Sequence, residues 1–168
     1  MSEIEDYVPE STLGLDSAAF YLRYPHPVLF VEEPGSASET TEFMTLAGHQ
    51  QASNVAAAAA KQGGRLIRIR KRGGNPFAMM ITIGRALNND IHIPGKDISK
   101  FHAFLSRSGS DWQITDAGST NGTFIAGEQL PLRSARPVEL GVPIVLGSTQ
   151  VTLLEGDHLY QHLARTVG

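Results

Sequence analysis

The residue pattern of the sequence changes after Gly64, and this change constrains the fold more than any other feature. From there on, short runs of β-forming residues alternate with turn residues at close intervals. Many short strands at such spacing predict an all-β protein, built as an antiparallel sandwich or barrel. The predicted strands cover Leu66–Arg70, Ala78–Ile83, Ala103–Arg107, Asp111–Thr115, Val138–Leu146 and Val151–Leu154.

The residues before Gly64 predict an extension that is partly helical or disordered. Asp16 can cap a short helix over residues 17–22, and an apolar segment, Val28–Val31, is expected to pack against another part of the protein. Residues 32–45 hold turn-forming and acidic residues and are interpreted as a flexible linker. The alanines and glutamines of residues 42–62 favour a helix.

The composition excludes several classes of site. The chain has 168 residues and no cysteine, so one domain with additional segments is expected, and disulfides, thiolate metal sites and cysteine nucleophiles are excluded. The absence of cysteine fits a reducing compartment, and the cytoplasm is the expected location. The first residues lack the parts of a secretory signal, and no stretch approaches the roughly 20 apolar residues that cross a bilayer. No membrane partner is expected.

Charge is divided unevenly along the chain. Residues 1–46 hold nine acidic residues against one base, a net charge of −8, so the other residues carry +5 of the total of −3. Such asymmetry suggests that the acidic segment associates with a basic surface of this chain or of another copy. The alternative is that the acidic segment and the basic surface are both simply exposed to solvent, which would give the same distribution of charge.

A run of bases raises the alternative of nucleic-acid binding. Arg68, Arg70 and Arg72 are predicted to share one face of a strand, and phosphate contacts draw on such bases. No aromatic residues interleave with them, as a stacking platform would require. We therefore interpret them as a solvated strand face or a dock for the acidic segment, and we expect no nucleic-acid partner.

Four short signatures lie between Ile83 and Phe124. They are Ile83-Gly84-Arg85, Asn88-Asn89-Asp90-Ile91, Ile98-Ser99-Lys100-Phe101-His102-Ala103 and Asp116-Ala117-Gly118-Ser119-Thr120-Asn121-Gly122-Thr123-Phe124. Their order and spacing resemble a forkhead-associated (FHA) domain. The resemblance covers residues 64–155 and implies an eleven-stranded antiparallel β-sandwich that binds phosphothreonine through loops at one end. It divides the chain into an acidic extension, 1–63, this domain, and a short tail or helix, 156–168.

The resemblance assigns roles to eight residues. Phosphate would be bound by Arg85, Ser99, Lys100 and Thr120, the peptide backbone by Asn121, and the loops would be shaped by Gly84, His102 and Gly122. A guanidinium fork and hydroxyl donors suit phosphate oxygens. An amide suits a peptide backbone because it offers a donor and an acceptor together.

Structural alternatives exist for several of these roles. Arg85 could pair with the acidic Asp90. Ser99 and Lys100 could be an ordinary turn residue and an exposed loop base. Asn121-Gly122 has the sequence of a two-residue hairpin turn, and such a turn could also aim the asparagine.

The residue preference around the phosphothreonine stays open. Asp97 precedes Ser99 by two positions, where some members of the family carry a base that reads an acidic residue after the phosphothreonine. That base is missing here, so basic and apolar residues suit the sequence as well as acidic ones.

Catalysis and cofactors are not expected. Ser99, His102 and Asp116 are the residue types of a hydrolase triad, but Ser99 and His102 are too close along the chain for the usual arrangement, and no nucleophile elbow is present. His158 and His162 have the spacing of metal ligands on a helix but lack a third candidate ligand. Walker and Rossmann fingerprints are missing. We predict a non-enzymatic protein without a metal or cofactor.

The acidic extension offers a ligand within the same chain. Thr40 and Thr41, in Glu39-Thr40-Thr41-Glu42-Phe43, resemble a stretch that a Ser/Thr kinase modifies in small bacterial single-FHA regulators, where the domain then binds its own tail. Either threonine could instead cap the following helix. We expect a signalling adaptor for a Ser/Thr-phosphorylated protein or peptide, linked to a Ser/Thr kinase and inhibited by its own phosphorylated extension. The alternative is a degenerate FHA module that acts in assembly without phosphate.

Overall fold

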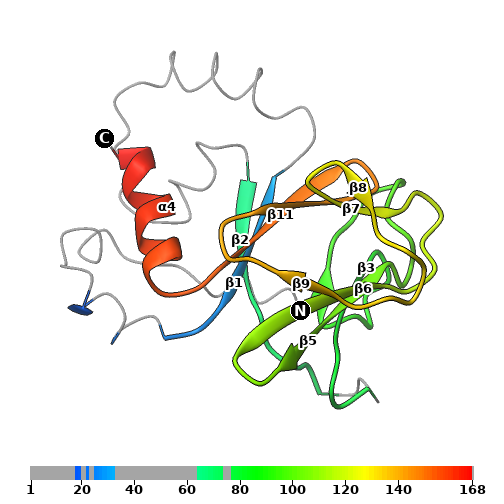
Figure 1. Ribbon diagram of the computed structural model, residues 1–168, viewed down its shortest axis with the longest axis horizontal. Helices are drawn as coiled ribbons and strands as arrows, with labels where there is room; N and C mark the ends of the chain where they lie inside the picture. The colour runs from blue at the N-terminus through cyan, green and yellow to red at the C-terminus, as the bar shows by residue number, and fades with distance from the viewer. Residues whose placement is uncertain (1–17, 20–21, 23–24, 33–63, 74–76, 168) are drawn as a thin grey trace. The chain divides into compact units, whose positions relative to one another are not determined.

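The computed structural model describes residues 18–19, 22, 25–32, 64–73 and 77–167 (Figure 1). Residue contacts divide the chain into two compact units. The first unit holds the residues up to Arg68 together with those from Leu154 onward, and the second holds Ile69–Leu153. The predicted linker over 32–45 and the predicted helix over 42–62 lie, apart from Glu32, outside the described residues. No helix within the described ranges is both long and apolar enough to cross a membrane.

The described part of the first unit contains an antiparallel pair of strands and a helix. Strand β1 (Val28–Glu32) pairs antiparallel with β2 (Gly64–Arg68), and helix α4 covers Asp157–Val167. Their buried side chains form one cluster of Val28, Phe30, Leu66, Leu154, Leu159 and Leu163. The expectation that the apolar segment Val28–Val31 packs against another part of the protein is thus confirmed.

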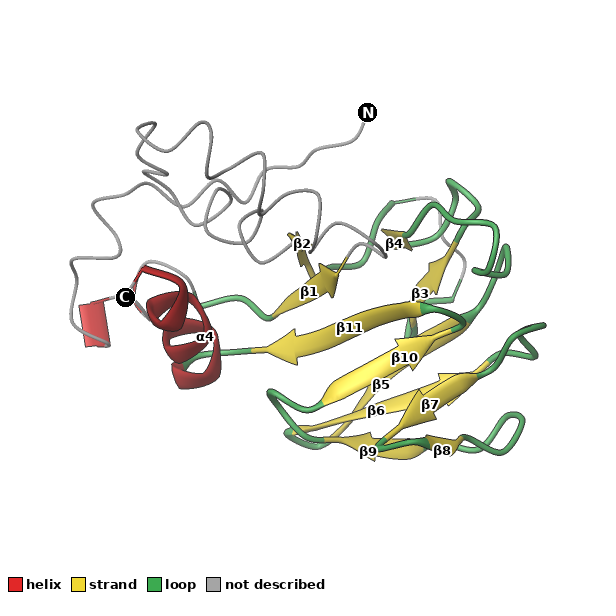
Figure 2. Cartoon of the chain, turned by 90° about the horizontal axis from the view of Figure 1, so that it is seen from above, coloured by secondary structure: helices red, strands yellow, loops and turns green. Residues whose placement is uncertain are grey.

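The second unit is a β-sandwich of two sheets, seen as two layers in Figure 2. Its strands are β3 (Ile81–Gly84), β4 (Ile91–His92), β5 (Ala103–Ser108), β6 (Asp111–Asp116), β7 (Thr123–Ile125), β8 (Glu128–Gln129), β9 (Arg136–Val138), β10 (Pro143–Leu146) and β11 (Thr149–Leu154). One sheet has the order β4-β3-β5-β6-β9, and the other contains β11-β10-β7-β8. The predicted all-β fold is confirmed, with eleven strands among the described residues.

The core of the sandwich follows the two-residue period of its strands. Leu105 of β5 lies opposite Ile114 of β6 and Ile81 of β3, and both Leu105 and Ile114 are fully buried. From the other sheet Ile144, Leu146, Val151 and Leu153 are equally buried. Because alternate residues point inward, the loops between strands are held on a packed frame.

The structure differs from the sequence prediction in several strands, and the strand predicted over Ala78–Ile83 begins only at Ile81. The run Val138–Leu146 is not one strand: β9 and β10 belong to different sheets, and a turn separates them where Gly141 has a φ of 82°. Strand β2 ends at Arg68, so Arg70 and Arg72 do not share a strand face with it, and that prediction was wrong. Strand β3 pairs with β4 in parallel, and the other strand pairs within the sandwich unit for which a register is given are antiparallel.

Candidate functional site

Loops from both sheets meet at one end of the sandwich. The backbone N–H of Arg85, after β3, donates to the carbonyl of Ser99, before β5, at 2.9 Å. The N–H of Thr120, between β6 and β7, donates to the Ser99 hydroxyl oxygen at 3.0 Å. The N–H of Gly147, between β10 and β11, donates to the carbonyl of Gly122 at 2.9 Å. Three of the four sequence signatures are thereby joined by direct hydrogen bonds.

The Arg85 side chain is exposed, and one nitrogen of its guanidinium is hydrogen-bonded to the protein. Its Nε–H donates to the carbonyl of Ile98 at 3.0 Å, and no described residue bonds the two terminal nitrogens. The alternative pairing with Asp90 does not occur, because the Asp90 carboxylate bonds Lys71 instead. The terminal nitrogens of Arg85 are therefore available to an anion.

Ser99 and Lys100 present polar groups from a fixed backbone. The Ser99 oxygen accepts from Thr120, so its own hydroxyl proton remains able to donate. The carbonyl of Lys100 accepts from the Ala86 N–H at 3.2 Å and from the Asn89 side-chain amide at 2.7 Å. These bonds hold the Lys100 backbone in place while its side chain stays exposed.

Thr120 and Asn121 lie on a segment that crosses from one sheet to the other. It joins β6 to β7, and those strands belong to different sheets, so the interpretation of Asn121-Gly122 as a two-residue hairpin was wrong. The Asn121 amide nitrogen donates to the carbonyl of Asp97 at 3.0 Å. This bond leaves the amide oxygen of Asn121 as an acceptor at the surface.

His102 connects two of the loops from a fully buried position. Its Nδ1 accepts from the Ser99 N–H at 3.1 Å, so the proton of the neutral ring lies on Nε2, which donates to the carbonyl of Gly122 at 3.0 Å. Burial lowers the pKa of His102 and outweighs the opposing effects of the Gly122 carbonyl and of Asp116. The lowered pKa favours the neutral ring, which the bond from the Ser99 N–H to Nδ1 requires.

Two glycines occupy positions that a side chain could not. A Cβ at Gly84 would overlap the carbonyl of Lys100 and lie 2.8 Å from the Asn89 amide nitrogen. Gly122 has a φ of 87°, and a Cβ there would lie 2.8 Å from the Gln129 amide nitrogen. Gly84 requires glycine because the Lys100 backbone lies too close for a side chain, and Gly122 requires it because residues with a side chain rarely adopt its positive φ.

Asp116 supports the segment that carries Thr120, a role that the sequence reasoning missed. Its buried carboxylate accepts from the N–H groups of Gly118 and Ser119, at 2.8 and 2.9 Å, and from the hydroxyls of Ser119 and Thr123, at 2.6 and 2.7 Å. Burial raises the pKa of Asp116, but these four donors together hold it below the usual value. The sequence suggests Asp116 only as a member of a triad, but within the described residues its carboxylate bonds neither Ser99 nor His102.

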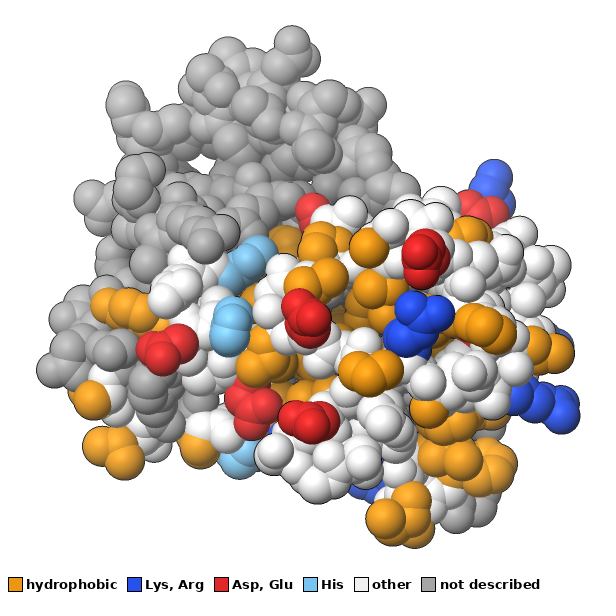
Figure 3. All heavy atoms as spheres, in the orientation of Figure 1, with side chains coloured by type: hydrophobic (Ala, Val, Ile, Leu, Met, Phe, Trp, Pro, Cys, Tyr) orange, Lys and Arg blue, Asp and Glu red, His pale blue; other side chains and the backbone are white. Residues whose placement is uncertain are grey.

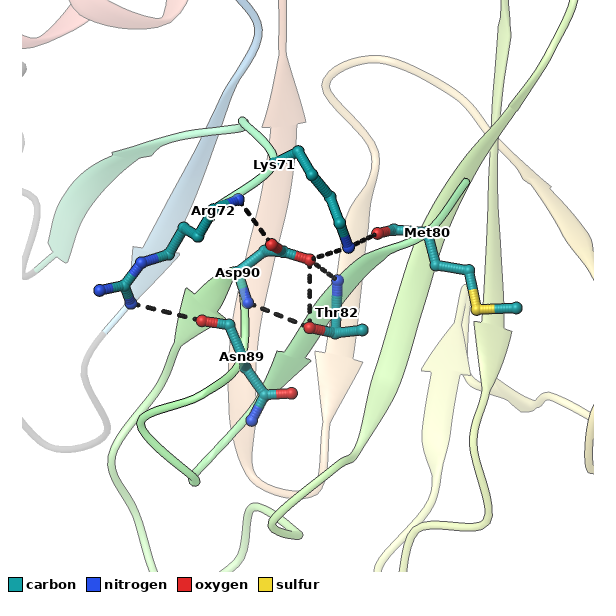
Figure 4. Close-up of polar contacts among 6 residues, drawn as sticks. All are labelled: Lys71, Arg72, Met80, Thr82, Asn89 and Asp90. Carbon is teal, nitrogen blue, oxygen red and sulfur yellow. Dashed lines mark hydrogen bonds and ion pairs between the residues drawn. The ribbon is translucent and has the colours of Figure 1, made fainter. Parts of the chain in front are cut away.

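Asn89 and Asp90 also support the loops, a role that the sequence did not predict (Figure 4). The Asp90 carboxylate accepts from the Lys71 ammonium at 2.9 Å, from the Arg72 N–H at 2.7 Å and from the Thr82 N–H at 2.8 Å. Burial raises the pKa of Asp90, but these donors together keep it below the usual value. The signature Asn88–Ile91 was visible in the sequence, but its partners lie too far along the chain to be identified from it.

The arrangement supplies what a phosphate group needs. Arg85 and Lys100 provide exposed positive charge, and Ser99 and Thr120 provide hydroxyls. The nearby carboxylate of Asp97 accepts from the Ser148 hydroxyl at 2.7 Å. Within the described part of the chain, no three potential metal ligands come together. Positive charge and hydroxyl donors favour an anion as the ligand.

Comparisons with known proteins identify the same region. Residues 81–147 match the family model described as FHA domain. The FHA domain-containing protein FhaB of Mycobacterium tuberculosis is 36% identical over 73 residues, which cover 44% of this chain and 46% of that protein. The oxoglutarate dehydrogenase inhibitor of Corynebacterium diphtheriae is 28% identical over 92 residues, which cover 51% of this chain and 62% of that protein. The matches thus span about half of FhaB and less than two thirds of the inhibitor.

The fold agrees with a solved structure as well. The crystal structure of the FHA domain of CT664 protein from Chlamydia trachomatis matches with a TM-score of 0.51 and 16% sequence identity. The match covers 77% of this chain and 97% of that domain. At this identity the comparison shows the shared sandwich fold.

Proposed function

This chain carries an FHA domain, related to those of the bacterial proteins FhaB and oxoglutarate dehydrogenase inhibitor, and on that premise we propose that it is a phosphothreonine-binding signalling adaptor. The observation that carries the proposal is the Thr120–Ser99 hydrogen bond beside Arg85. It holds the backbone of Thr120 against the Ser99 hydroxyl, at the loop end where the terminal nitrogens of Arg85 have no partner among the described residues.

The chemistry of the ligand matches these groups. A phosphothreonine carries a charge of roughly −1.5 to −2 and three strong acceptor oxygens. Arg85 and Lys100 supply charge, and the hydroxyls of Ser99 and Thr120 supply neutral donors. The free amide oxygen of Asn121 can accept from a ligand backbone N–H. We assign no reaction to the site, since the Ser99 hydroxyl is bonded to Thr120 and not to His102.

The test is a titration of phosphothreonine peptides into wild type and Arg85→Ala. Wild type should bind at micromolar Kd, and Arg85→Ala should lose measurable binding. Arg107→Ala is the matched control, because Arg107 is an exposed arginine at the far end of β5, where it lies 4.1 Å from the Trp112 ring. Thermal denaturation would verify that each variant is folded. Binding that survives in Arg85→Ala would contradict the proposal.

The second candidate is a degenerate FHA module that binds partners without phosphate. It shares the fold and differs in its ligand, so the same titration separates the two. Equal affinity of wild type for phosphorylated and unphosphorylated peptides, or no binding of either, would favour it.

We further propose that the ligand is supplied in part by the chain itself, in the cytoplasm, after modification by a Ser/Thr kinase. Thr40 and Thr41 lie in the acidic residues 1–46, whose net charge of −8 complements the +5 of the remainder. A tether of this length gives an effective concentration in the millimolar range, so a micromolar site would be largely occupied. Kinase-treated wild type should bind added phosphopeptide more weakly than the treated Thr40→Ala/Thr41→Ala variant. Equal binding, with phosphate present on wild type by mass spectrometry, would exclude self-inhibition.

A further inference from the structure

Asn121 stands before Gly122, and no other asparagine of the chain is followed by glycine. An asparagine side chain is most easily lost as ammonia in this sequence, because glycine has no side chain to shield its own backbone nitrogen. Asn121 is also exposed, so water reaches it. The proposed function places the Asn121 amide against the ligand backbone. A change at this amide would therefore act on the binding site itself.

The reaction needs only the chain and water. The backbone nitrogen of Gly122 attacks Cγ of Asn121, so that a new N–Cγ bond closes a five-membered succinimide ring and the bond from Cγ to Nδ2 breaks. The leaving nitrogen takes the proton of the Gly122 N–H and departs as ammonia. Water then opens the ring, at Cγ to give aspartate or at the main-chain carbonyl carbon to give isoaspartate. At neutral pH either acid is ionised and its proton passes to ammonia.

Hydrogen bonds hold both reacting groups in the folded chain. The Gly122 N–H donates to the Ser119 hydroxyl oxygen at 2.9 Å, and the Asn121 amide nitrogen donates to the Asp97 carbonyl at 3.0 Å. The Ser119 hydroxyl is fixed in turn, because it donates to the Asp116 carboxylate at 2.6 Å. Attack therefore requires a local opening of the loop, which these bonds oppose. The fold slows a reaction that the sequence favours.

We propose that Asn121 is a deamidation site, restrained by the Gly122–Ser119 bond, and that its conversion irreversibly weakens phosphothreonine binding. The product lacks the N–H that bonds the Asp97 carbonyl, so two oxygens would face each other there. Its negative charge also repels a phosphate dianion. On the face seen in Figure 3 acidic and basic side chains are interspersed, so no large field of one sign there would mask a single added charge.

The effect on binding rests on the proposed function, and one further consequence follows from it. A ligand that binds only the closed loop lowers the population of the open loop by mass action. Occupied sites should therefore keep Asn121, while unoccupied sites lose it with time. Conversion at Asn121 would in this way remove idle copies of the domain and spare those bound to a partner.

The first test follows Asn121 in the folded full chain. Wild type and Ser119→Ala are incubated at physiological temperature and mildly alkaline pH, and peptide mapping by mass spectrometry and enzymatic labelling of isoaspartate measure conversion. Ser119→Ala should convert about fivefold faster, as expected for loss of one hydrogen bond. Ser108→Ala is the matched control, because Ser108 is an exposed serine at the far end of β5. All three proteins should convert equally fast, and fastest, when unfolded in urea, and thermal denaturation verifies that each is folded without urea.

The second test measures binding. The probe is a synthetic peptide with the sequence of residues 36–48, phosphorylated at Thr41, titrated into the unphosphorylated full chain. Converted wild type and Asn121→Asp should both bind at least about tenfold more weakly than fresh wild type. Gln113→Glu is the control, because it makes the same amide-to-acid change within β6, and it should leave the Kd unchanged. A saturating concentration of the peptide should slow conversion of wild type.

The two tests fail separately. If folded wild type keeps Asn121 while the unfolded chain converts, or if Ser119→Ala converts no faster than wild type, the restrained deamidation site is overturned. If converted protein and Asn121→Asp bind as well as fresh wild type, the effect on binding is overturned. If fresh wild type binds no phosphothreonine peptide, the proposed function fails and the effect on binding fails with it, whereas conversion is decided by the mass spectra alone.

Discussion

The hydroxyl oxygen of Ser99 accepts a hydrogen bond from the backbone N–H of Thr120, a residue 21 positions further along the chain. This bond holds the backbone of Thr120 beside the Ser99 side chain. Ser99→Ala removes both the bond and a donor, and phosphothreonine peptides should bind about 10- to 100-fold more weakly, the range for a hydrogen bond to a charged group. Calorimetric titration measures this. An unchanged Kd would show that Ser99 does not touch the ligand.

Gly84→Ala should destabilise the domain. Its new methyl would overlap the Lys100 carbonyl and crowd the Asn89 amide, and a backbone group cannot move aside cheaply. The expected loss in the free energy of unfolding is about 1–3 kcal/mol, measured by urea denaturation. Gly73→Ala is the control, because nothing lies within 4 Å of a Cβ at Gly73. Equal stability of the two variants would contradict the prediction.

Because the pKa of His102 is lowered in the folded protein, we predict that the protein becomes less stable as the pH decreases through a defined window. In the unfolded chain the imidazole titrates near its ordinary pKa of 6.5, and in the folded protein the pKa is lower because the ring is buried. Below about pH 6.5 the unfolded chain therefore binds more protons, and the free energy of unfolding decreases by up to about 1.4 kcal/mol per pH unit.

His102→Gln would remove this dependence without adding charge. Urea denaturation of wild type and His102→Gln between about pH 7.5 and pH 5 should give a smaller slope for the variant. The other histidines are common to both proteins, so they cancel in the comparison. Parallel pH profiles would exclude His102 as the group responsible.

Asp116 should affect stability in the more acidic part of the pH range. Its pKa is held below the ordinary 3.8, so its stabilisation is present above that value and lost as pH falls through the lowered pKa. Asp116→Asn leaves the hydroxyls of Ser119 and Thr123 without their acceptor and should cost about 1–3 kcal/mol near pH 7. The difference from wild type should narrow near pH 3. A constant difference at both pH values would argue against the carboxylate charge.

Lys71→Met tests the ion pair between Lys71 and Asp90. The Asp90 side chain is fully buried and would lose its cation. The free energy of unfolding should therefore decrease by about 2 kcal/mol or more. Arg72→Ala is the matched control, because Arg72 contacts Asp90 through its backbone N–H, which the substitution retains. Urea denaturation of both variants measures the difference, and similar losses would assign the effect to general surface charge.

The sequence signatures predicted which loops carry polar groups, because each signature is local. The β-forming runs likewise predicted the strands of the core, including β5 and β6. The sequence predictions were wrong where the chain crosses from one sheet of the sandwich to the other. A turn at Gly141 divides a continuous apolar run between two sheets, and the segment with Asn121-Gly122 crosses between them. Local propensity does not contain this information.

The supports of the site were missed for a different reason. Asp90 depends on Lys71 and Thr82, 19 and 8 positions away, and Lys71 also reaches Met80. A buried carboxylate looks the same in sequence as an exposed one, and only the fold shows which donors surround it. Asp116 is the exception, because its donors Gly118, Ser119 and Thr123 follow it closely and could have suggested a capped loop.

Several of the bonds that fasten these loops use main-chain carbonyls as acceptors, at Asp97, Ile98, Lys100 and Gly122. A carbonyl is present whichever amino acid occupies the position. Randomised libraries at Asp97 and Lys100 should therefore contain many folded members, whereas libraries at Gly84, His102 and Asp116 should contain few. The domain could in this way acquire a new binding partner by surface substitution alone, with its architecture unchanged.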